Sequence, residues 1–240
     1  MIINADDFCL NKRVTEAIRK AFSLNVVDRT TCMVNTGFFN EEMNNEWTKS
    51  HMAQIGLHLN LTEGKPLTGQ IKECKNFVDE SGDFINNLNN RKGMRLFFLK
   101  RKEKKALRLE IEAQFKLFRS LNDESNFFDS HHHIHTVFSI FKIIKPIAKK
   151  YGFSSTRLSK NVNLGGKSFV NLYKRFFNKY VSRRFSCLEY FGAYNDYMNS
   201  HFTKFDNCEM MVHPDLIDGE LIDLSSNLNM IEYERFKKHE

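Results

Sequence analysis

Four of the nine histidines lie within five residues, in the segment Asp129-Ser130-His131-His132-His133-Ile134-His135. Neutral imidazole is the commonest metal ligand among protein side chains, and its ordinary pKa of about 6.5 suits proton transfer at neutral pH. If the segment is a β-strand, His131, His133 and His135 share one face with Asp129, and His132 lies on the other face. The segment therefore predicts a metal or proton-transfer site, with the other histidines supporting it or contacting substrate.

Two ordinary explanations of this segment are weaker. A purification tag is terminal and uninterrupted, whereas this run is internal and lies between Phe127-Phe128 and Val137-Phe138. A single histidine in an apolar stretch is usually a hydrogen-bonded core residue, but three on one face would each need a buried partner. We therefore expect at least one of the four to bind metal or to move protons.

An aspartate pair and a fifth histidine extend the set. Asp6-Asp7 follows the short apolar run Ile2-Ile3, and His58 lies in an alternating segment, residues 53–61, where Asn60 shares its face. Two imidazoles and one carboxylate leave coordination positions open for water and substrate, as in catalytic metal sites. Hydrolysis fits, because a metal lowers the pKa of bound water and the second aspartate can accept the proton. An aspartate pair alone commonly marks a turn or a helix cap.

Near the C-terminal end, His213 follows the apolar run Met210-Met211-Val212 and precedes Pro214. A residue before proline is pushed toward extended geometry, so His213 is expected to project from a strand end. This position makes it a candidate general acid. The alternative, a surface strand end without a role, is equally compatible with the composition.

The order of expected elements predicts an α/β fold. Strands are expected at residues 2–3, 26–34, 53–61, 129–135, 156–158 and 209–213, with helices after Asn11, around 107–118 and at 140–150. In the second helix the apolar stripe is formed by Leu107, Ile111, Phe115 and Phe118, with Glu110, Gln114 and Lys116 expected off it. Alternation of strand and helix predicts a parallel sheet with the site at the carboxyl ends of its strands. The polar segment 70–93 is expected to cross the mouth of a barrel.

Composition limits the class of protein. A chain of 240 residues is expected to form a single domain over 1–240. Its five scattered cysteines contain no CxxC pair, which disfavours a disulfide framework and a zinc ribbon. The start lacks the features of a signal peptide and no stretch resembles a transmembrane segment, so a cytoplasmic location is expected. The net charge of +7 gathers at residues 91–108 and 174–184, which could attract an anionic polymer or a membrane, although nucleic acid is not the expected partner.

Four motifs, in this order along the chain, resemble those of the YdjC-like carbohydrate deacetylases, which include the chitooligosaccharide deacetylases. They span residues 4 to 214 and are jointly specific, and the helix with Glu110 and Gln114 and the segment 156–158 resemble weaker features of the family. The motifs are Asn4-Ala5-Asp6-Asp7-Phe8, Gly56-Leu57-His58-Leu59-Asn60-Leu61-Thr62 with Gly64-Lys65-Pro66-Leu67, Asp129 to His135, and Val212-His213-Pro214.

The resemblance implies a distorted (β/α) barrel related to the NodB-type polysaccharide deacetylases, and hydrolysis of the acetyl amide of N-acetylated sugars such as N-acetylglucosamine units. It implies a divalent metal, with Mg²⁺ and Zn²⁺ both open, whose bound water attacks the amide carbonyl. Asn60, His133, His135 and Arg157 are expected to contact the sugar, and a homodimer is compatible with the resemblance. The implied ligands are Asp7, His58 and His131, with Asp6 as the base and His213 as the acid that protonates the leaving amine.

The chain departs from the family pattern at two places. Cys9 stands where the family usually has glycine, and its Cβ would cost about 1 to 2 kcal/mol if the backbone there has a positive φ. The segment 164–199 is basic and aromatic and carries no family motif. It could bind a particular glycan, form a subunit interface or close the barrel.

Two other functions compete with the deacetylase. Two histidines and a carboxylate also suit non-haem iron oxygenases, although that class gives no role to the aspartate pair or to His213. The basic segments instead suit a glycan- or nucleic-acid-binding protein with a degenerate metal site, which would bind polymer in a salt-dependent way without turnover.

Overall fold

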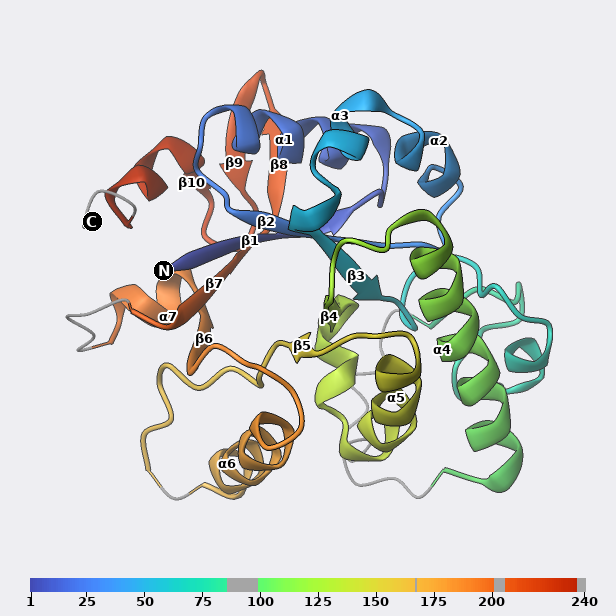
Figure 1. Ribbon diagram of the computed structural model, residues 1–240. Coiled ribbons are helices and arrows are strands. Elements are labelled where there is room, and N and C mark those ends of the chain that lie inside the picture. Colours follow the sequence, from blue (N-terminus) through green and yellow to red (C-terminus); the bar gives the residue numbers. More distant parts are fainter. Residues whose placement is uncertain (86–98, 167, 201–205, 237–240) are drawn as a thin grey trace. The chain divides into compact units, whose positions relative to one another are not determined.

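The computed structural model describes residues 1–85, 99–166, 168–200 and 206–236, and Figure 1 shows its helices and strands. Seven strands form one sheet in the order β5-β4-β3-β2-β1-β7-β6, and the pairs β1–β7, β6–β7 and β3–β4 are parallel. The predicted α/β class with a parallel sheet is confirmed and matches a distorted (β/α) barrel. The chain divides into two compact units, Met1–Thr31 with Ser155–Glu240 (unit 1) and Cys32–Ser154 (unit 2). The single domain over 1–240 stays a prediction.

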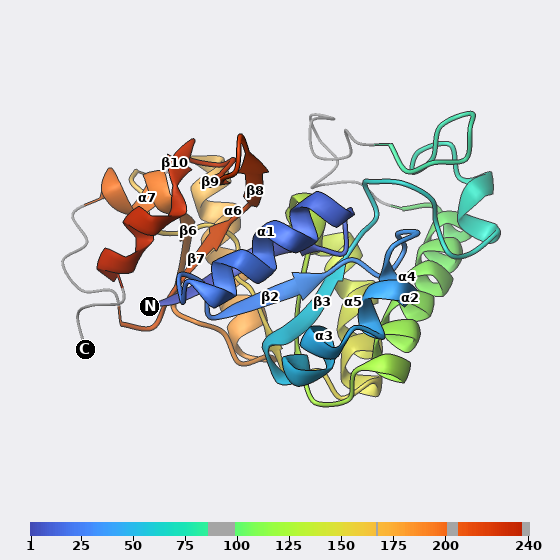
Figure 2. The ribbon, with the colours of Figure 1, turned by 90° about the horizontal axis from the view of Figure 1, so that it is seen from above.

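Unit 1 begins with the strand, loop and helix that the sequence predicts. Strand β1 (Ile2–Phe8) is followed by helix α1 (Lys12–Ser23). The side chain of Asn11 caps the helix by accepting a hydrogen bond from the backbone N–H of Val14 at 3.0 Å. The helix buries Ala17 and Ile18, and it packs against β1 and against strand β8 (Pro214–Ile217), beside which it lies in Figure 2.

The remaining elements of unit 1 were only partly foreseen. The segment after residue 160 contains two helices and two strands of the sheet, and then a three-stranded antiparallel sheet in the order β10-β9-β8. The elements are β2 (Arg29–Cys32, whose last residue falls in unit 2), β5 (Ser155–Thr156), α6 (Phe169–Ser182), β6 (Tyr190–Ala193), α7 (Tyr194–Met198), β7 (Cys208–Val212), β8 (Pro214–Ile217), β9 (Glu220–Asp223), β10 (Leu228–Asn229) and a closing 3-10 helix (Met230–Phe236).

Unit 2 places two long helices beside two parallel strands. Glu110 and Gln114 lie on the buried side of α4, which corrects the prediction that they lie off its apolar stripe. Of the segment 70–93, residues 86–93 lie outside the described residues. The elements are α2 (Phe39–Met43), α3 (Glu46–Ser50), two 3-10 helices (Met52–Gln54 and Gln70–Glu73), β3 (Ile55–Leu59), α4 (Arg101–Leu121), β4 (Phe127–Ser130), a further 3-10 helix (His131–Thr136) and α5 (Phe138–Lys150). None of the described helices is both long enough and apolar enough to span a bilayer.

Gly56 allows β3 to lie close to the aromatic side chain at the start of β4. A Cβ atom added at Gly56 would lie 2.3 Å from Cε2 of Phe127, a distance that real Cβ atoms do not show. The two strands pair in parallel, with His58 opposite Asp129. The glycine of the Gly56-Leu57-His58 motif is therefore required by packing.

The backbone of Cys9 has φ 68°, the left-handed conformation expected if the family's glycine uses a positive φ. The Cys9 side chain is fully buried, and its backbone N–H donates to Oγ1 of Thr15 at 3.2 Å. Helix α1 thus fixes the conformation of this residue. The chain tolerates a Cβ here at a cost of about 1 to 2 kcal/mol.

We expect Cys9→Gly to be more stable than Cys9→Ala by about 1 kcal/mol, because alanine keeps the strained Cβ and glycine removes it. Both variants lose the buried sulfur, so the difference between their free energies of unfolding reports the backbone strain alone. At Cys32 in β2 the order should reverse, since glycine in a strand is ordinarily about 0.5 to 1 kcal/mol less stable than alanine. Urea unfolding of the four variants measures both differences in free energy. If the alanine variant were more stable than the glycine variant at both positions, the proposed backbone strain at Cys9 would be contradicted.

Candidate active site

Asp6, Asp7 and His213 line one pocket of unit 1. Strands β1 and β7 pair in parallel with Ala5 opposite Val212, so the next residues along each strand, Asp6 and His213, meet at the carboxyl edge. All three side chains line a cavity of about 280 Å³ at that edge. The structure therefore brings together the aspartate pair and the C-terminal histidine, residues more than 200 positions apart in the sequence.

A turn of the backbone allows both aspartates to line the same pocket. Successive side chains of a regular strand point to opposite faces, which would separate Asp6 from Asp7. Asp7 has φ 72°, and aspartate is one of the few residues other than glycine that adopts this conformation readily. Both carboxylates are almost completely buried.

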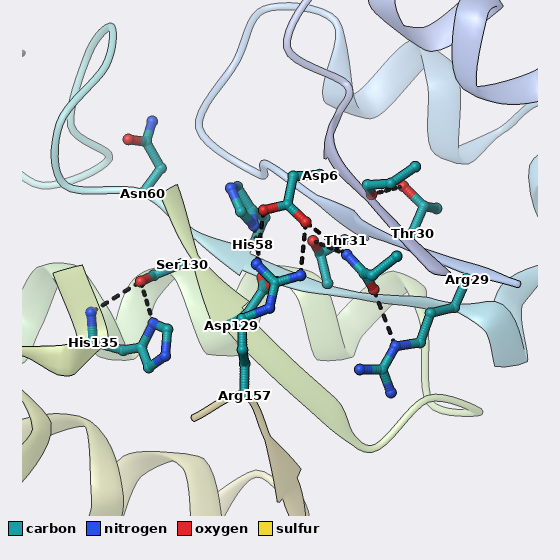
Figure 3. A network of polar contacts seen from close by, with 12 residues as sticks. Asp6, Arg29, Thr30, Thr31, His58, Asn60, Asp129, Ser130, His135 and Arg157 are labelled. Atoms are coloured by element: carbon teal, nitrogen blue, oxygen red, sulfur yellow. Dashed lines mark hydrogen bonds and ion pairs between the residues drawn. The ribbon is translucent and has the colours of Figure 1, made fainter. Parts of the chain in front are cut away.

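Arg157 holds Asp6 through two parallel hydrogen bonds. Its Nη1 donates to Oδ2 and its Nη2 to Oδ1 of Asp6, each at 2.7 Å, and Asn4 donates a third bond to Oδ1 at 2.7 Å (Figure 3). The Arg157 side chain is 1% exposed. Bidentate pairing with a guanidinium favours the charged carboxylate, which is the form that can accept a proton. Arg157 thus orients Asp6, and its predicted contact with the sugar stays a prediction.

The guanidinium of Arg157 also pairs with Glu209, a charged residue inside the apolar strand β7. Nε of Arg157 donates to Oε1 of Glu209 at 2.7 Å, and Arg29 pairs with the other oxygen at 2.9 Å. Arg29 in turn donates to Oδ1 of Asn4 at 3.0 Å. The carboxylates of Asp6 and Glu209 and the guanidinium groups of Arg157 and Arg29 therefore form a network in which the charges balance, as burial requires.

His213 is held by its backbone. Its N–H donates to Oδ1 of Asp223 at 2.8 Å, and the hydroxyl of Tyr233 donates to Oδ2 of the same carboxylate at 2.6 Å. Burial, together with the charge of Asp223, raises the pKa of Tyr233, so its hydroxyl remains a donor. The imidazole is half-buried at the strand end before Pro214, as the sequence predicts.

Unit 2 carries the other two proposed ligands, His58 and His131. Nδ1 of His58 lies 2.6 Å from Oδ1 of Asp129 on the neighbouring strand (Figure 3). The rings of His58 and His131 meet edge to face with centroids 5.6 Å apart, and one nitrogen of each lies within 4.8 Å of the other. Both histidines and Asp129 are buried, so unit 2 contains a buried Asp/His cluster with donor types that hold metals.

The histidine segment is not a strand, and the predicted alternation of its side chains is wrong. Strand β4 ends at Ser130, and residues 131–136 form a 3-10 helix in which His132 and His133 have φ 50° and 54°. His132 is exposed and packs its ring on that of His131, while His133 is half-buried. His135 is buried with its Nδ1 on the hydroxyl of Ser130. The tight turn brings only His131 beside His58.

Asn60, predicted to contact the sugar, organises the loop after β3. Its amide donates to Oδ1 of Asn35 and to the carbonyl of Glu63, and its Oδ1 accepts from the backbone N–H groups of Thr62 and Glu63. Gln114 of α4 bonds both the N–H and the C=O of Asn60. One turn earlier in the helix, the carboxylate of Glu110 accepts hydrogen bonds from the backbone N–H groups of Leu67 and Thr68 and from the hydroxyl of Thr68. These contacts explain why α4 buries two polar residues.

The two histidines fit a divalent metal by the chemistry of their donors. An imidazole whose Nδ1 is fixed by a carboxylate commonly binds metal through its other nitrogen, Nε2, and the carboxylate sets its orientation. His58 and Asp129 form this pair in unit 2. Asp7 of unit 1 is the third ligand that the sequence predicts, and its side chain is buried.

Sequence reasoning missed three supporting carboxylates. Asp129 was noted only as part of the histidine run, although its place next to that run was a usable signal. Glu209 is a lone charge in an apolar strand, which commonly indicates a buried ion pair. Asp223 gave no signal, because only the folded hairpin brings it to His213 and only the closing 3-10 helix brings Tyr233 to it.

The comparison with protein families finds a match to the model described as YdjC-like protein over residues 1–240. A protein named carbohydrate deacetylase from Clostridium beijerinckii is 27% identical over 234 residues, covering 94% of this chain and 85% of that protein. One of the same name from Vibrio cholerae serotype O1 is 31% identical over 224 residues, covering 91% and 79%.

A solved structure has the same fold. It is the crystal structure of a putative cellobiose-phosphate cleavage protein from Enterococcus faecalis V583, with a TM-score of 0.62 and 22% identity, covering 90% of this chain and 81% of that one. At this identity the likeness bears on the fold alone.

We expect Arg157→Met to lower the free energy of unfolding by about 3 to 5 kcal/mol, because it leaves Asp6 buried without its cation. Adding Asp6→Asn should recover part of the loss, since the neutral amide needs no counter-charge. Arg119→Met is a matched control, because the guanidinium of Arg119 donates to the backbone carbonyls of Tyr151, Asn122 and Ser125. Urea unfolding measures all of them, and equal losses for both single variants without recovery in the double variant would contradict the charge argument.

We expect Asp129→Asn to weaken Zn²⁺ binding by about 10- to 100-fold, because the amide orients His58 less firmly and makes it a poorer ligand. Asp123→Asn, an exposed carboxylate in the loop before β4, should leave the affinity unchanged. Calorimetric titration of metal into the apo-proteins provides the measurement. Equal affinities for the two variants would remove Asp129 from the site.

Proposed function

Because the chain belongs to the YdjC-like family, we propose that it is a metal-dependent hydrolase that removes the acetyl group from an N-acetylated sugar. Several curated relatives that match nearly all of the chain are named carbohydrate deacetylases, a class of hydrolases. The observation that carries the proposal is the pocket lined by Asp6, Asp7 and His213 at the carboxyl edge of β1 and β7. It places a charged carboxylate and an imidazole on one cavity, the pair that acid–base hydrolysis of an amide needs.

The proposed metal ligands are Asp7, His58 and His131. All three side chains are buried, and the set of one carboxylate and two imidazoles leaves coordination positions for water and substrate. When bound there, a divalent cation would lower the pKa of a coordinated water and polarise the amide carbonyl. Two nitrogen donors favour zinc over magnesium, because magnesium prefers an all-oxygen environment.

Asp6 is the proposed base. Hydrogen bonds from Arg157 and Asn4 favour the charged form of its carboxylate, and Oδ2 accepts one of them while Oδ1 accepts two. As the water oxygen bonds to the carbonyl carbon, its proton passes to Asp6. The fixed orientation of the carboxylate lowers the entropic cost of this transfer.

His213 is the proposed acid. When the C–N bond breaks, its imidazolium gives a proton to the leaving nitrogen, and the products are acetate and a free amino sugar. Asp223 positions the backbone of His213 and Tyr233 supports that carboxylate. The apolar side chains on the same pocket, Leu10, Val14 and Leu224, offer a surface for the acetyl methyl group.

We expect the metal-replete protein to release acetate from at least one member of a panel of N-acetylglucosamine oligosaccharides, and a chelator to abolish the release. Asp7→Asn, His58→Ala and His131→Ala should lose bound metal and activity together. Asp6→Asn and His213→Ala should keep the metal and lose about 10²- to 10⁴-fold in rate, because each removes a proton-transfer group. Acetate release and metal content are measured on the same samples.

His51→Ala is the matched control, since His51 stacks on Trp47 at the end of α3 and lies outside the proposed set. It should keep both metal and activity. Undiminished acetate release from His131→Ala would refute the ligand assignment. Salt-dependent binding of polymer without turnover, in protein that still binds metal, would favour the glycan- or nucleic-acid-binding alternative instead.

A further inference from the structure

Helix α6 exposes a row of large apolar side chains. Phe169, Leu172 and Phe176 are 70%, 65% and 54% exposed, and their spacing of three and four residues places them on one face. The stacked rings of Phe176 and Tyr180 extend the row by another turn. We refer to Phe169, Leu172, Phe176 and Tyr180 as the apolar row.

The opposite face of α6 already has its core contacts. Phe177 and Val181 are fully buried, and Asn178 forms two hydrogen bonds with the backbone of Ser159, accepting from its N–H and donating to its C=O at 2.9 Å each. The helix is thus attached to unit 1 by one face. The apolar row belongs to its outer surface.

Basic residues lie beside the apolar row. Arg175 and Lys179, one turn apart, are both exposed, and Arg183 follows where the helix ends. From Arg157 to Leu188 the sequence contains eight basic residues and no acidic one. The guanidinium of Arg184 packs over the ring of Tyr180 at 3.7 Å, so cations also lie at the C-terminal end of the row.

We propose that α6 docks on an anionic lipid surface, with the apolar row inserted among the acyl chains and the basic residues on the headgroups. A helix that carries Phe and Leu on one face and Lys and Arg beside them has the composition of an interfacial helix. Each basic residue close to an anionic membrane adds about fivefold to the affinity. This docking is independent of the chemistry in the pocket.

The charges favour lipid over the two other partners that could cover this face. In a symmetric dimer the same patch meets itself, which would bring the cations of two copies together with no acidic residue on α6 to offset them. Nucleic acid would match the cations, but its bases stack on aromatic faces and leave the aliphatic Leu172 and Val170 without a suitable contact. An anionic bilayer matches both the cations and the apolar row.

Helix α6 is connected to the segment that carries Arg157. Asn178 holds Ser159, which lies two residues after Arg157, and Arg157 orients Asp6. The docked helix and the proposed base are therefore joined by a short, hydrogen-bonded segment of unit 1.

The test is co-sedimentation of the full-length protein with vesicles of phosphatidylcholine alone or mixed in equal parts with phosphatidylglycerol. We expect binding to the anionic vesicles at least about tenfold tighter than to the neutral ones, and weakened by salt. Phe169→Ser with Phe176→Ser should lower it about tenfold or more. Arg175→Glu with Lys179→Glu should lower it about 25-fold or more.

The controls are matched in type and exposure. Ile217→Ser with Ile231→Ser removes exposed apolar residues elsewhere, and Lys104→Glu with Lys105→Glu reverses two exposed charges on α4. Both should bind vesicles as the parent does. Circular dichroism, and acetate release from a soluble oligosaccharide, should be unchanged in every α6 variant, which separates this test from that of the deacetylase.

Three outcomes would overturn the proposal. Equal binding to both vesicle types would remove the role of charge, and unchanged binding of the α6 variants would place the lipid contact elsewhere. Absence of vesicle binding would refute it directly. In that case, analytical sedimentation could show a dimer that the variant Phe169→Ser with Phe176→Ser no longer forms, which would assign the apolar row to a second copy. RNA binding that is lost in the variant Arg175→Glu with Lys179→Glu would assign the helix to nucleic acid.

Discussion

The double hydrogen bond between Arg157 and Asp6 is the constraint on which the pocket depends. A buried carboxylate needs a buried cation, and Arg157 in turn needs Glu209, which is paired with Arg29. Strands β1, β2 and β7, which carry Asp6, Arg29 and Glu209, are therefore tied together by charge as well as by backbone pairing. A site for proton transfer requires a carboxylate that is charged, oriented and shielded from bulk water, and this network provides all three conditions.

Much of the fold follows from local patterns. Asn11 and the apolar spacing after it predicted α1, and strand and helix alternation predicted the parallel sheet. The pattern failed where the tertiary environment decides. Glu110 and Gln114 were placed off the apolar stripe of α4, yet the loop after β3 needs their hydrogen bonds and both are buried. No spacing rule reveals such a partner forty or more residues away.

The sequence identified the residues of the candidate site better than it identified their arrangement. The motifs identified Asp6, Asp7, His58, His131 and His213, and β1 pairs with β7 where the strand-end argument expects Asp6 and His213. The histidine segment was predicted to be a strand over residues 129–135, but β4 ends at Ser130. Its two left-handed residues, His132 and His133, have no signature in the sequence comparable to glycine. The contact of Arg157 with the sugar stays a prediction, whereas its bonds to Asp6 and Glu209 had no signal in the sequence.

The contact between Gly56 and the ring of Phe127 has a consequence for sequence change. Any side chain at position 56 would collide with the ring, so the spacing of β3 and β4, and with it the distance between His58 and Asp129, depends on both residues. A larger residue at 56 is tolerable only together with a smaller one at 127. The two positions should therefore vary as a pair during divergence, and a compensating exchange between them would preserve the orientation of His58.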